Sequence, residues 1–126
     1  MINTFDDLVD AAKEQPEPQR LLLMFAKTET DPENPSSGSI TPTMCIDKLP
    51  EELSSFEALI IEADEISTEW DFIFCGGLSG TDGAAPSSDD AEPHLKEMTT
   101  QLISGEGLSQ YLIFDRQEQL ITLNVA

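Results

Sequence analysis

Three observations predict that residues 1–126 form a single α/β (α+β) domain, in which three helices cover a mixed sheet of about five strands that ends in a C-terminal β-hairpin. Short apolar runs typical of buried strands alternate with segments whose apolar residues recur at helical spacing. Apolar residues make up 39% of the chain, enough for an ordinary core despite a formal charge of −19. The order strand, helix, strand, helix, strand favours crossover connections, so some neighbouring strands should be parallel.

The first helix is expected to begin after Thr4, whose side chain can cap it, and to end before Pro16. Its apolar stripe consists of Phe5, Leu8, Val9 and Ala12. Residues 21–26 are an unbroken apolar run, which predicts a central strand covered on both faces. The segment 28–42 contains one apolar residue, Ile40, among polar residues, Pro and Gly, so we predict a flexible surface loop there.

Residues 43–46 predict a further short strand, and Pro50 predicts the start of the second helix because proline fits a first helical turn. This helix should have an apolar face and an opposite acidic face. The acidic face consists of Glu51, Glu62, Glu65 and Glu69. Residues 70–75 resemble a second buried strand and lead into a glycine-rich loop at 76–86. A third helix is expected from Ser87 or Ser88 onwards, followed by a hairpin of the apolar runs 111–114 and 120–123.

The charges are strongly segregated along the chain. No Lys or Arg occurs in the 47 residues between Lys48 and Lys96, whereas 12 Asp and Glu do. An almost unopposed negative field repels nucleic acids and anionic membranes and favours basic partners. We therefore predict a non-catalytic interaction or regulatory module whose acidic face docks a basic protein surface. Solubility, or adaptation to a salty cytoplasm, would explain the same composition.

A second hypothesis places a small-molecule, anion or divalent-cation site in the loop 76–86, with Gly76, Gly77, Ser79, Gly80 and Asp82 as its candidate residues. Consecutive glycines let backbone N–H groups converge on an anion, and aspartates supply the oxygen ligands that divalent cations prefer. The spacing matches neither a P-loop nor an EF-hand, and no Lys follows the glycines. A strand-to-helix turn whose glycines allow positive φ also accounts for the pattern.

No catalytic residue, cofactor or metal site is predicted. His94 is the only histidine, and the two cysteines, Cys45 and Cys75, lie in apolar runs where buried, inert thiols are expected. The N-terminal residues contain neither a basic patch nor an apolar run, and no stretch approaches the ~20 apolar residues of a membrane span. A cytoplasmic location is therefore expected, whereas the sequence does not indicate an oligomeric state.

Four short strings resemble a family of small acidic proteobacterial proteins that are often labelled as a ribonucleotide reductase alpha subunit. They are residues 15–22, 44–48, 78–80 with Ala85-Pro86, and 114–117. The resemblance implies a link to nucleotide metabolism. Radical reduction of nucleotides requires a cysteine pair and a radical cysteine, whereas this chain has two cysteines in all. No functional residue is therefore carried over from the family.

Overall fold

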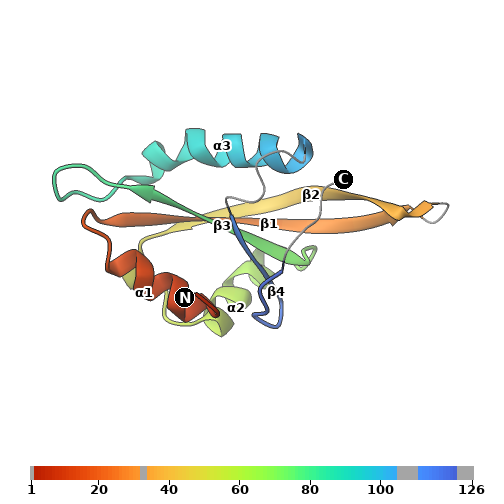
Figure 1. The fold of residues 1–126 in the computed structure, drawn as a ribbon, viewed down its shortest axis with the longest axis horizontal. Helices are drawn as coiled ribbons and strands as arrows, with labels where there is room; N and C mark the ends of the chain where they lie inside the picture. Colours follow the sequence, from red (N-terminus) through yellow and green to blue (C-terminus); the bar gives the residue numbers. More distant parts are fainter. Residues whose placement is uncertain (1, 32–33, 105–110, 122–126) are drawn as a thin grey trace.

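The structure, a computed structural model, describes residues 2–31, 34–104 and 111–121. α1 and α2 lie on one side of a sheet and α3 on the other, so the described elements form three layers (Figure 1). In chain order the elements are α1 (Phe5–Lys13), β1 (Gln19–Asp31), β2 (Asn34–Lys48), the 3-10 helix η1 (Pro50–Glu52), α2 (Phe56–Ile66), β3 (Phe72–Ser79), α3 (Ser88–Ser104) and β4 (Leu112–Asp115).

The described strands form one sheet in the order β2-β1-β3-β4, and every neighbouring pair is antiparallel. The predicted α+β class with three helices is confirmed. The mixed sheet of about five strands is wrong, because the described sheet has four strands and no parallel pair. The reason is that β2 and β3, which do run in the same direction, are separated by β1, so the crossover through α2 does not create a parallel contact.

Strands β1 and β2 form a long hairpin that includes the segment 28–42. The ladder pairs Thr28 with Ile40 and Glu29 with Ser39, so the prediction of a surface loop at 28–42 is wrong for the described residues. The sequence shows no apolar alternation here, because most of this part of the hairpin extends beyond the part of the sheet that the helices cover (Figure 1). Main-chain hydrogen bonds pair the two strands there. The threonines of this segment suit a strand.

Strand β1 is buried on both faces over residues 21–26, as predicted. All six side chains of this run in β1 are at most 3% exposed. Side chains alternate between the faces: Leu21, Leu23 and Phe25 belong to the core under α1 and α2, whereas Leu22, Met24 and Ala26 belong to the core under α3. Aromatic contacts also stabilise the core under α1 and α2. An example is the edge-to-face pair of Phe25 and Trp70, whose ring centroids are 5.1 Å apart.

The helix starts follow capping chemistry. Thr4 caps α1 as predicted, since its Oγ1 accepts from the N–H of Asp7 at 3.2 Å. The prediction that the second helix begins at Pro50 is wrong: Pro50 opens only the short helix η1, and α2 begins at Phe56 after its cap, Ser55. Consequently Glu51 does not lie on the same helix as Glu62.

The C-terminal part of the described chain reverses direction as predicted, but only its first half forms a regular strand, β4. β4 is followed by a turn, after which Leu120 makes an isolated bridge with Phe114 and the N–H of Ile121 donates to the carbonyl of Ile113 at 2.8 Å. The remainder of the predicted second strand, 122–123, lies outside the described residues. The turn also contacts α1, because the carboxylate of Glu118 accepts from the N–H of Phe5 at 2.8 Å.

Arg116, in the same turn, joins β4 to the end of α2. Its guanidinium donates to both carboxylate oxygens of Asp64, at 3.3 and 3.2 Å, and to the carbonyl of Thr68 at 2.8 Å. It also stacks on the ring of Trp70, 3.8 Å from the ring centroid, while the Trp70 indole donates to Asp64 at 3.0 Å. The hydrogen bond from Arg116 lowers the pKa of Asp64 below its ordinary value, with a further contribution from Trp70.

Replacing Asp64 tests this contact. Asp64→Asn removes the charge but keeps an oxygen for the Trp70 indole, so we expect a loss of ~1 kcal/mol of unfolding free energy at pH 7. Because the folded-state pKa is lowered, the contribution is present above the unfolded pKa of about 4 and is lost as the pH falls through the folded value. The difference from the wild type should therefore shrink toward zero in strong acid. Urea unfolding followed by the fluorescence of Trp70, the only tryptophan, measures it.

The matched control is Glu65→Gln, which removes a charge from the same helix without touching Arg116. This variant should lose no stability at either pH. An equal loss in both variants would contradict a specific contribution of the contact between Arg116 and Asp64.

Candidate functional site

The four glutamates of the predicted acidic face do not form one helical stripe. Glu51 lies in η1, Glu62 and Glu65 lie on α2, and Glu69 follows the end of α2. Glu51, Glu65 and Glu69 are exposed, and Glu62 is partly exposed. The predicted face therefore consists of separate positions on the α1–α2 side of the sheet.

Two of these four glutamates are paired with lysines. Lys48 lies 3.1 Å from Glu62, and Lys27 lies 3.0 Å from Glu69. The expectation of unopposed charge is therefore wrong for Glu62 and Glu69. The physical reason is tertiary: β1 and β2 bring Lys27 and Lys48, which are distant in sequence, next to α2 and the segment after it. Within the described part of the chain, Glu51 and Glu65 have no ion pair.

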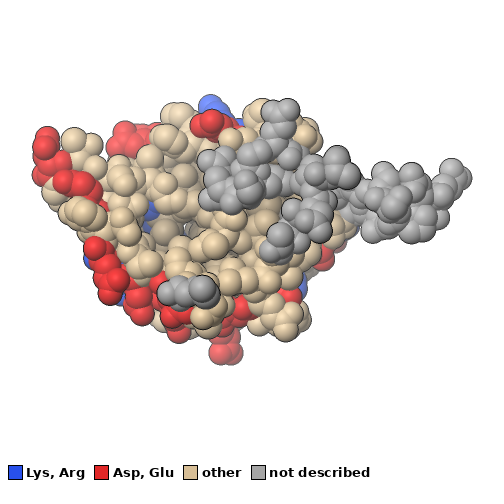
Figure 2. Space-filling model, in the orientation of Figure 1, with Lys and Arg blue, Asp and Glu red and all other residues tan. Residues whose placement is uncertain are grey.

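The sequence reasoning missed other exposed carboxylates on the same layer. They extend along the lower rim of the molecule, where α1 and α2 lie (Figure 2). We define the acidic α1–α2 surface by its exposed members, which are Asp6, Asp10, Glu14, Glu51, Glu52, Glu57 and Glu65. Their signal in the sequence was available, because acids occupy the polar side of the α1 stripe as well.

Carboxylates remain in excess even if every basic side chain is paired with one of them. The chain has 25 acidic and 6 basic side chains, so at least 25 − 6 = 19 carboxylates cannot be matched by a base. Among the described residues, Arg20, Lys27, Lys48, Lys96 and Arg116 each form an ion pair with an acid. The negative field is therefore a property of the folded surface.

The predicted glycine loop is wrong in its first half, because β3 runs to Ser79. Gly76 and Gly77 lie in this strand and pair with Leu22 and Leu21 of β1. The ring of Tyr111 packs on Gly76, where a Cβ would lie 3.3 Å from the ring. A glycine therefore fits the sheet at a point where an aromatic side chain covers it.

The second half of the segment is a tight turn in which four backbone N–H groups already donate to protein acceptors. Asp82 and Gly83 have positive φ angles of 53° and 80°, and the N–H groups of Thr81 and Ala84 each donate to the other's carbonyl at 3.0 Å. The N–H of Gly80 donates to Pro18 at 2.8 Å, and that of Gly83 to the Glu17 carboxylate at 2.9 Å. This arrangement does not favour an anion cradle, since those groups point to protein acceptors.

The divalent-cation alternative also finds no support in this region. Among the described residues, no three His, Cys, Asp or Glu side chains gather as metal ligands would. Asp82 is exposed at the tip of the turn, and Asp90 accepts from the N–H of Ser87 at 3.1 Å. The predicted candidate Asp82 therefore does not belong to a group of carboxylates that could hold a cation.

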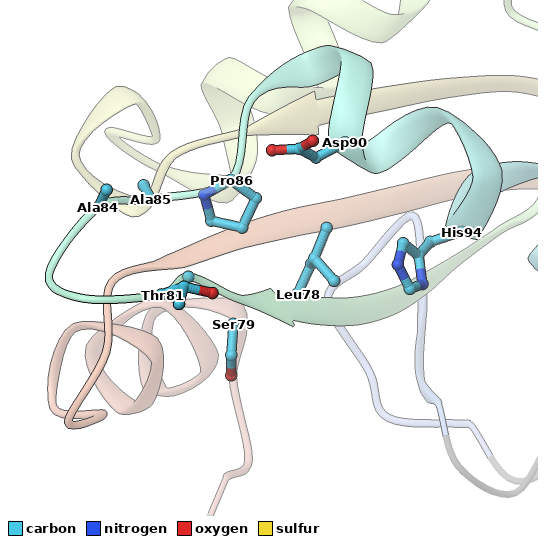
Figure 3. A pocket seen from close by; sticks show the side chains of 9 residues that line it. Leu78, Ser79, Thr81, Ala84, Ala85, Pro86, Asp90 and His94 are labelled. Atoms are coloured by element: carbon cyan, nitrogen blue, oxygen red, sulfur yellow. The ribbon is translucent and has the colours of Figure 1, made fainter.

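A pocket of about 430 Å³ lies between the end of β3 and the first half of α3. Figure 3 shows His94 and Leu78 facing each other across it, with Asp90 above Pro86. Ser79 points to the other side of the sheet, where its Oγ accepts from Gln19 at 2.8 Å. Of the predicted loop candidates, Ser79 and Gly80 line this pocket, Gly76 and Gly77 line neighbouring ones, and Asp82 lines none of these.

Asp90 and His94 were not predicted as a pair. They lie four residues apart on α3, so both reach the pocket from successive turns. The i, i+4 spacing was the available signal. Nothing in the sequence indicated which face of α3 would adjoin the end of β3.

A hydrogen-bonded group fixes the N-terminus of α3 on the sheet. Arg20 donates to Asp47 and to Ser88, both at 2.6 Å, and Ser88 donates to Asp47 at 2.7 Å. Partial burial alone would raise the pKa of Asp47. The hydrogen bonds from Ser88 and Arg20, together with the charge of Arg20, outweigh burial and lower that pKa.

The two cysteines differ in exposure. Cys75 is buried, as predicted, and burial raises the pKa of its thiol strongly. The prediction that Cys45 is buried is wrong: it is exposed on β2, which forms one edge of the sheet. Desolvation and the neighbouring Asp47 raise the Cys45 pKa as well, so neither thiol is activated as a thiolate.

No family model, curated protein sequence or solved structure matches the chain at a significant level. The resemblance to the proteins labelled as ribonucleotide reductase alpha subunits therefore stays a prediction. Among the described helices, none has the length and apolar character needed to cross a membrane.

Glycine substitutions test the geometry at the end of β3. Gly80→Ala would place a Cβ 2.0 Å from the carbonyl oxygen of Ala84 and 3.0 Å from that of Pro18, so the turn must move. We expect a loss of roughly 2 kcal/mol of unfolding free energy, measured by urea unfolding. In the matched control, Gly77→Ala, the nearest atom is the flexible Gln19 side chain at 3.4 Å, and the change should stay within about 1 kcal/mol. Equal effects at both positions would contradict the crowding at Gly80.

Proposed function

We propose that this protein is a non-catalytic interaction or regulatory module that docks a basic protein surface on its acidic α1–α2 surface. One observation carries the proposal: the chain has 25 acidic and 6 basic side chains, so 19 carboxylates remain in excess after one-to-one pairing. The elements α1, η1 and α2 contain a single base, Lys13. On α2, Glu62 and Asp64 are paired with Lys48 and Arg116. The members of the acidic α1–α2 surface have no ion pair among the described residues and are therefore available to an external cation.

The physics of such docking is long-range attraction followed by short-range pairing. Unpaired carboxylates on one layer attract Lys- and Arg-rich surfaces and accelerate their association. Each exposed pair contributes little, so affinity depends on several pairs acting together and falls with ionic strength. The partner is thus a protein surface with several exposed basic side chains, and binding should be sensitive to salt.

A non-catalytic role agrees with the chemistry of the nucleophiles. The two thiols have raised pKa values, and within the described residues no Ser, Thr or Cys is hydrogen-bonded to His94, the chain's only histidine. A cytoplasmic location belongs to the same proposal, because Cys45 and Cys75 are both free thiols.

The second candidate function is small-molecule binding at the pocket between β3 and α3. The observation that favours it is a cavity of about 430 Å³ with Asp90 and His94 on one wall. A nucleotide ligand would link the pocket to the nucleotide metabolism that the family resemblance implies. The Asp90 carboxylate repels phosphate groups. The pocket therefore favours a cationic small molecule over a phosphorylated one.

A pair of charge variants tests the docking proposal. The triple variant Glu51→Gln, Glu57→Gln, Glu65→Gln removes three of the seven carboxylates of the acidic α1–α2 surface. The matched variant Asp82→Asn, Asp89→Asn, Glu92→Gln removes the same charge from α3 and the turn before it. Wild-type protein should retain a partner from cell lysate at about 50 mM salt and release it near 1 M. The first variant should retain roughly tenfold less and the second about as much as wild type.

Two results would contradict the proposal. One is the absence of any partner whose capture depends on salt. The other is an equal loss in both triple variants, which would show that only total charge matters. Circular dichroism of each variant establishes that it is folded.

A further inference from the structure

The chain contains a single Asp-Gly step, Asp82-Gly83, and it lies in the turn between β3 and α3. Both residues are exposed, and a Cβ at Gly83 would have no neighbouring atom within 4 Å. Because glycine has no side chain, its backbone nitrogen is the least hindered of any residue's. Asp82-Gly83 is therefore the place where an aspartate carboxyl and the next backbone nitrogen of this chain react with least hindrance.

That reaction changes the backbone without an external reagent. The nitrogen of Gly83 attacks Cγ of the protonated Asp82 carboxyl. The N–Cγ bond forms, a Cγ–O bond breaks, and the hydroxyl leaves as water together with the proton of the N–H. Water then opens the resulting succinimide ring at either carbonyl, which gives back aspartate or gives isoaspartate, whose backbone runs through Cγ. Water is released once and consumed once, so the net change is an isomerisation.

The folded turn holds the two reacting groups apart. Asp82 and Gly83 have φ angles of 53° and 80°, and the N–H groups of Thr81 and Ala84 each donate to the other's carbonyl, which is a type I′ arrangement. In such a turn the ψ angle of the first central residue is about +30°, the mirror image of type I. Ring closure needs the Gly83 nitrogen nearly eclipsed with Cβ of Asp82. The peptide group between them must therefore rotate far from its position in the turn.

The carboxylate of Glu17 restrains this rotation. Its Oε2 accepts from the N–H of Gly83 at 2.9 Å, and this N–H belongs to the attacking nitrogen. The carbonyl of the next residue, Pro18, accepts from the N–H of Gly80 at 2.8 Å. Two hydrogen bonds thus fasten the turn to the segment before β1. Rotating the peptide group toward the Asp82 carboxyl breaks the bond to Glu17.

We propose that Asp82-Gly83 is a site of spontaneous isoaspartate formation, and that Glu17 is the positioning residue that keeps it unmodified in the folded protein. Conversion lengthens the backbone inside the turn, which is incompatible with the reciprocal hydrogen bonds of Thr81 and Ala84. The end of β3 would then lose its fixed connection to α3. This proposal does not rest on the docking function, because it concerns a covalent change on a different part of the molecule.

The wild-type protein alone provides the first test. Folded protein and the same chain in guanidinium chloride are incubated in neutral buffer for several weeks. Isoaspartate is then quantified by enzymatic methylation and located by mass spectrometry of peptides. Isomerisation at Asp82 should be at least about tenfold slower in the folded protein, because the turn must open before the ring can close. Every other aspartate is followed by a residue with a side chain, so the peptides that contain them are internal controls.

Four variants locate the restraint. Glu17→Ala removes the acceptor and should raise the rate at Asp82 at least about fivefold in the folded protein. Glu17→Gln keeps an oxygen for the Gly83 N–H and should return the rate to within about threefold of wild type. Glu14→Ala removes a nearby exposed carboxylate, and Asp64→Asn destabilises the fold away from the turn. Both should stay within about twofold of wild type, because neither touches the turn.

Four results would overturn the proposal. They are the absence of isoaspartate at Asp82 in the unfolded chain, equal rates in the folded and unfolded wild type, equal rates in Glu17→Ala and Glu17→Gln, and equal acceleration in Glu17→Ala and Asp64→Asn. Circular dichroism establishes that each variant is folded, and the wild-type comparison stands without any variant. None of these results bears on the docking function, which concerns the acidic α1–α2 surface.

Discussion

The structure depends on one constraint, the burial of β1 on both faces. Its residues 21–26 alternate between two cores and are almost inaccessible to solvent, so apolar cover is required above and below the sheet. α1 and α2 supply it on one side and α3 on the other. Each helix then turns its polar side outward, and in this chain the polar side is acidic. The surface charge therefore follows from the same constraint that builds the core.

With only six bases, the chain places several of them where elements meet. Arg20 joins β1, β2 and the start of α3, and Arg116 joins β4 to the end of α2 and to Trp70. Both arginines use several donors of the guanidinium at once, which a lysine ammonium does not reproduce with the same geometry. Lys48 and Lys27 hold the α2 region against the strands. Scarce positive charge thus stabilises junctions, and the remaining carboxylates are left to solvent or a partner.

Much of the fold could be predicted from local pattern, because burial and capping leave local signals. The strand at 21–26 and the Thr4 cap are examples. The antiparallel topology could not be predicted, since the distal part of the β1–β2 hairpin is held by main-chain bonds and carries no apolar period. Likewise, proline at position 50 suits a 3-10 turn as well as an α-helix, so the start of α2 was misplaced.

The candidate site was less predictable than the fold. Gly76 is explained by the ring of Tyr111, which is distant in sequence, whereas Gly77 faces the side chain of Gln19. The pairing of Glu62 and Glu69 with lysines depends on tertiary contacts of the same kind. Asp90 and His94 on α3 show the reverse case. Their helical spacing is visible in the sequence, but the segment of β3 that faces them is not.

The contact between Glu118 and Phe5 links two segments that are far apart in the sequence. The N–H group of Phe5, at the N-terminal end of α1, donates to a carboxylate 113 positions later. Bringing the two residues together closes a loop of that length, and the entropic cost of closing a loop grows with its length. This contact therefore adds to the non-local pairings of the fold, which favour slow folding.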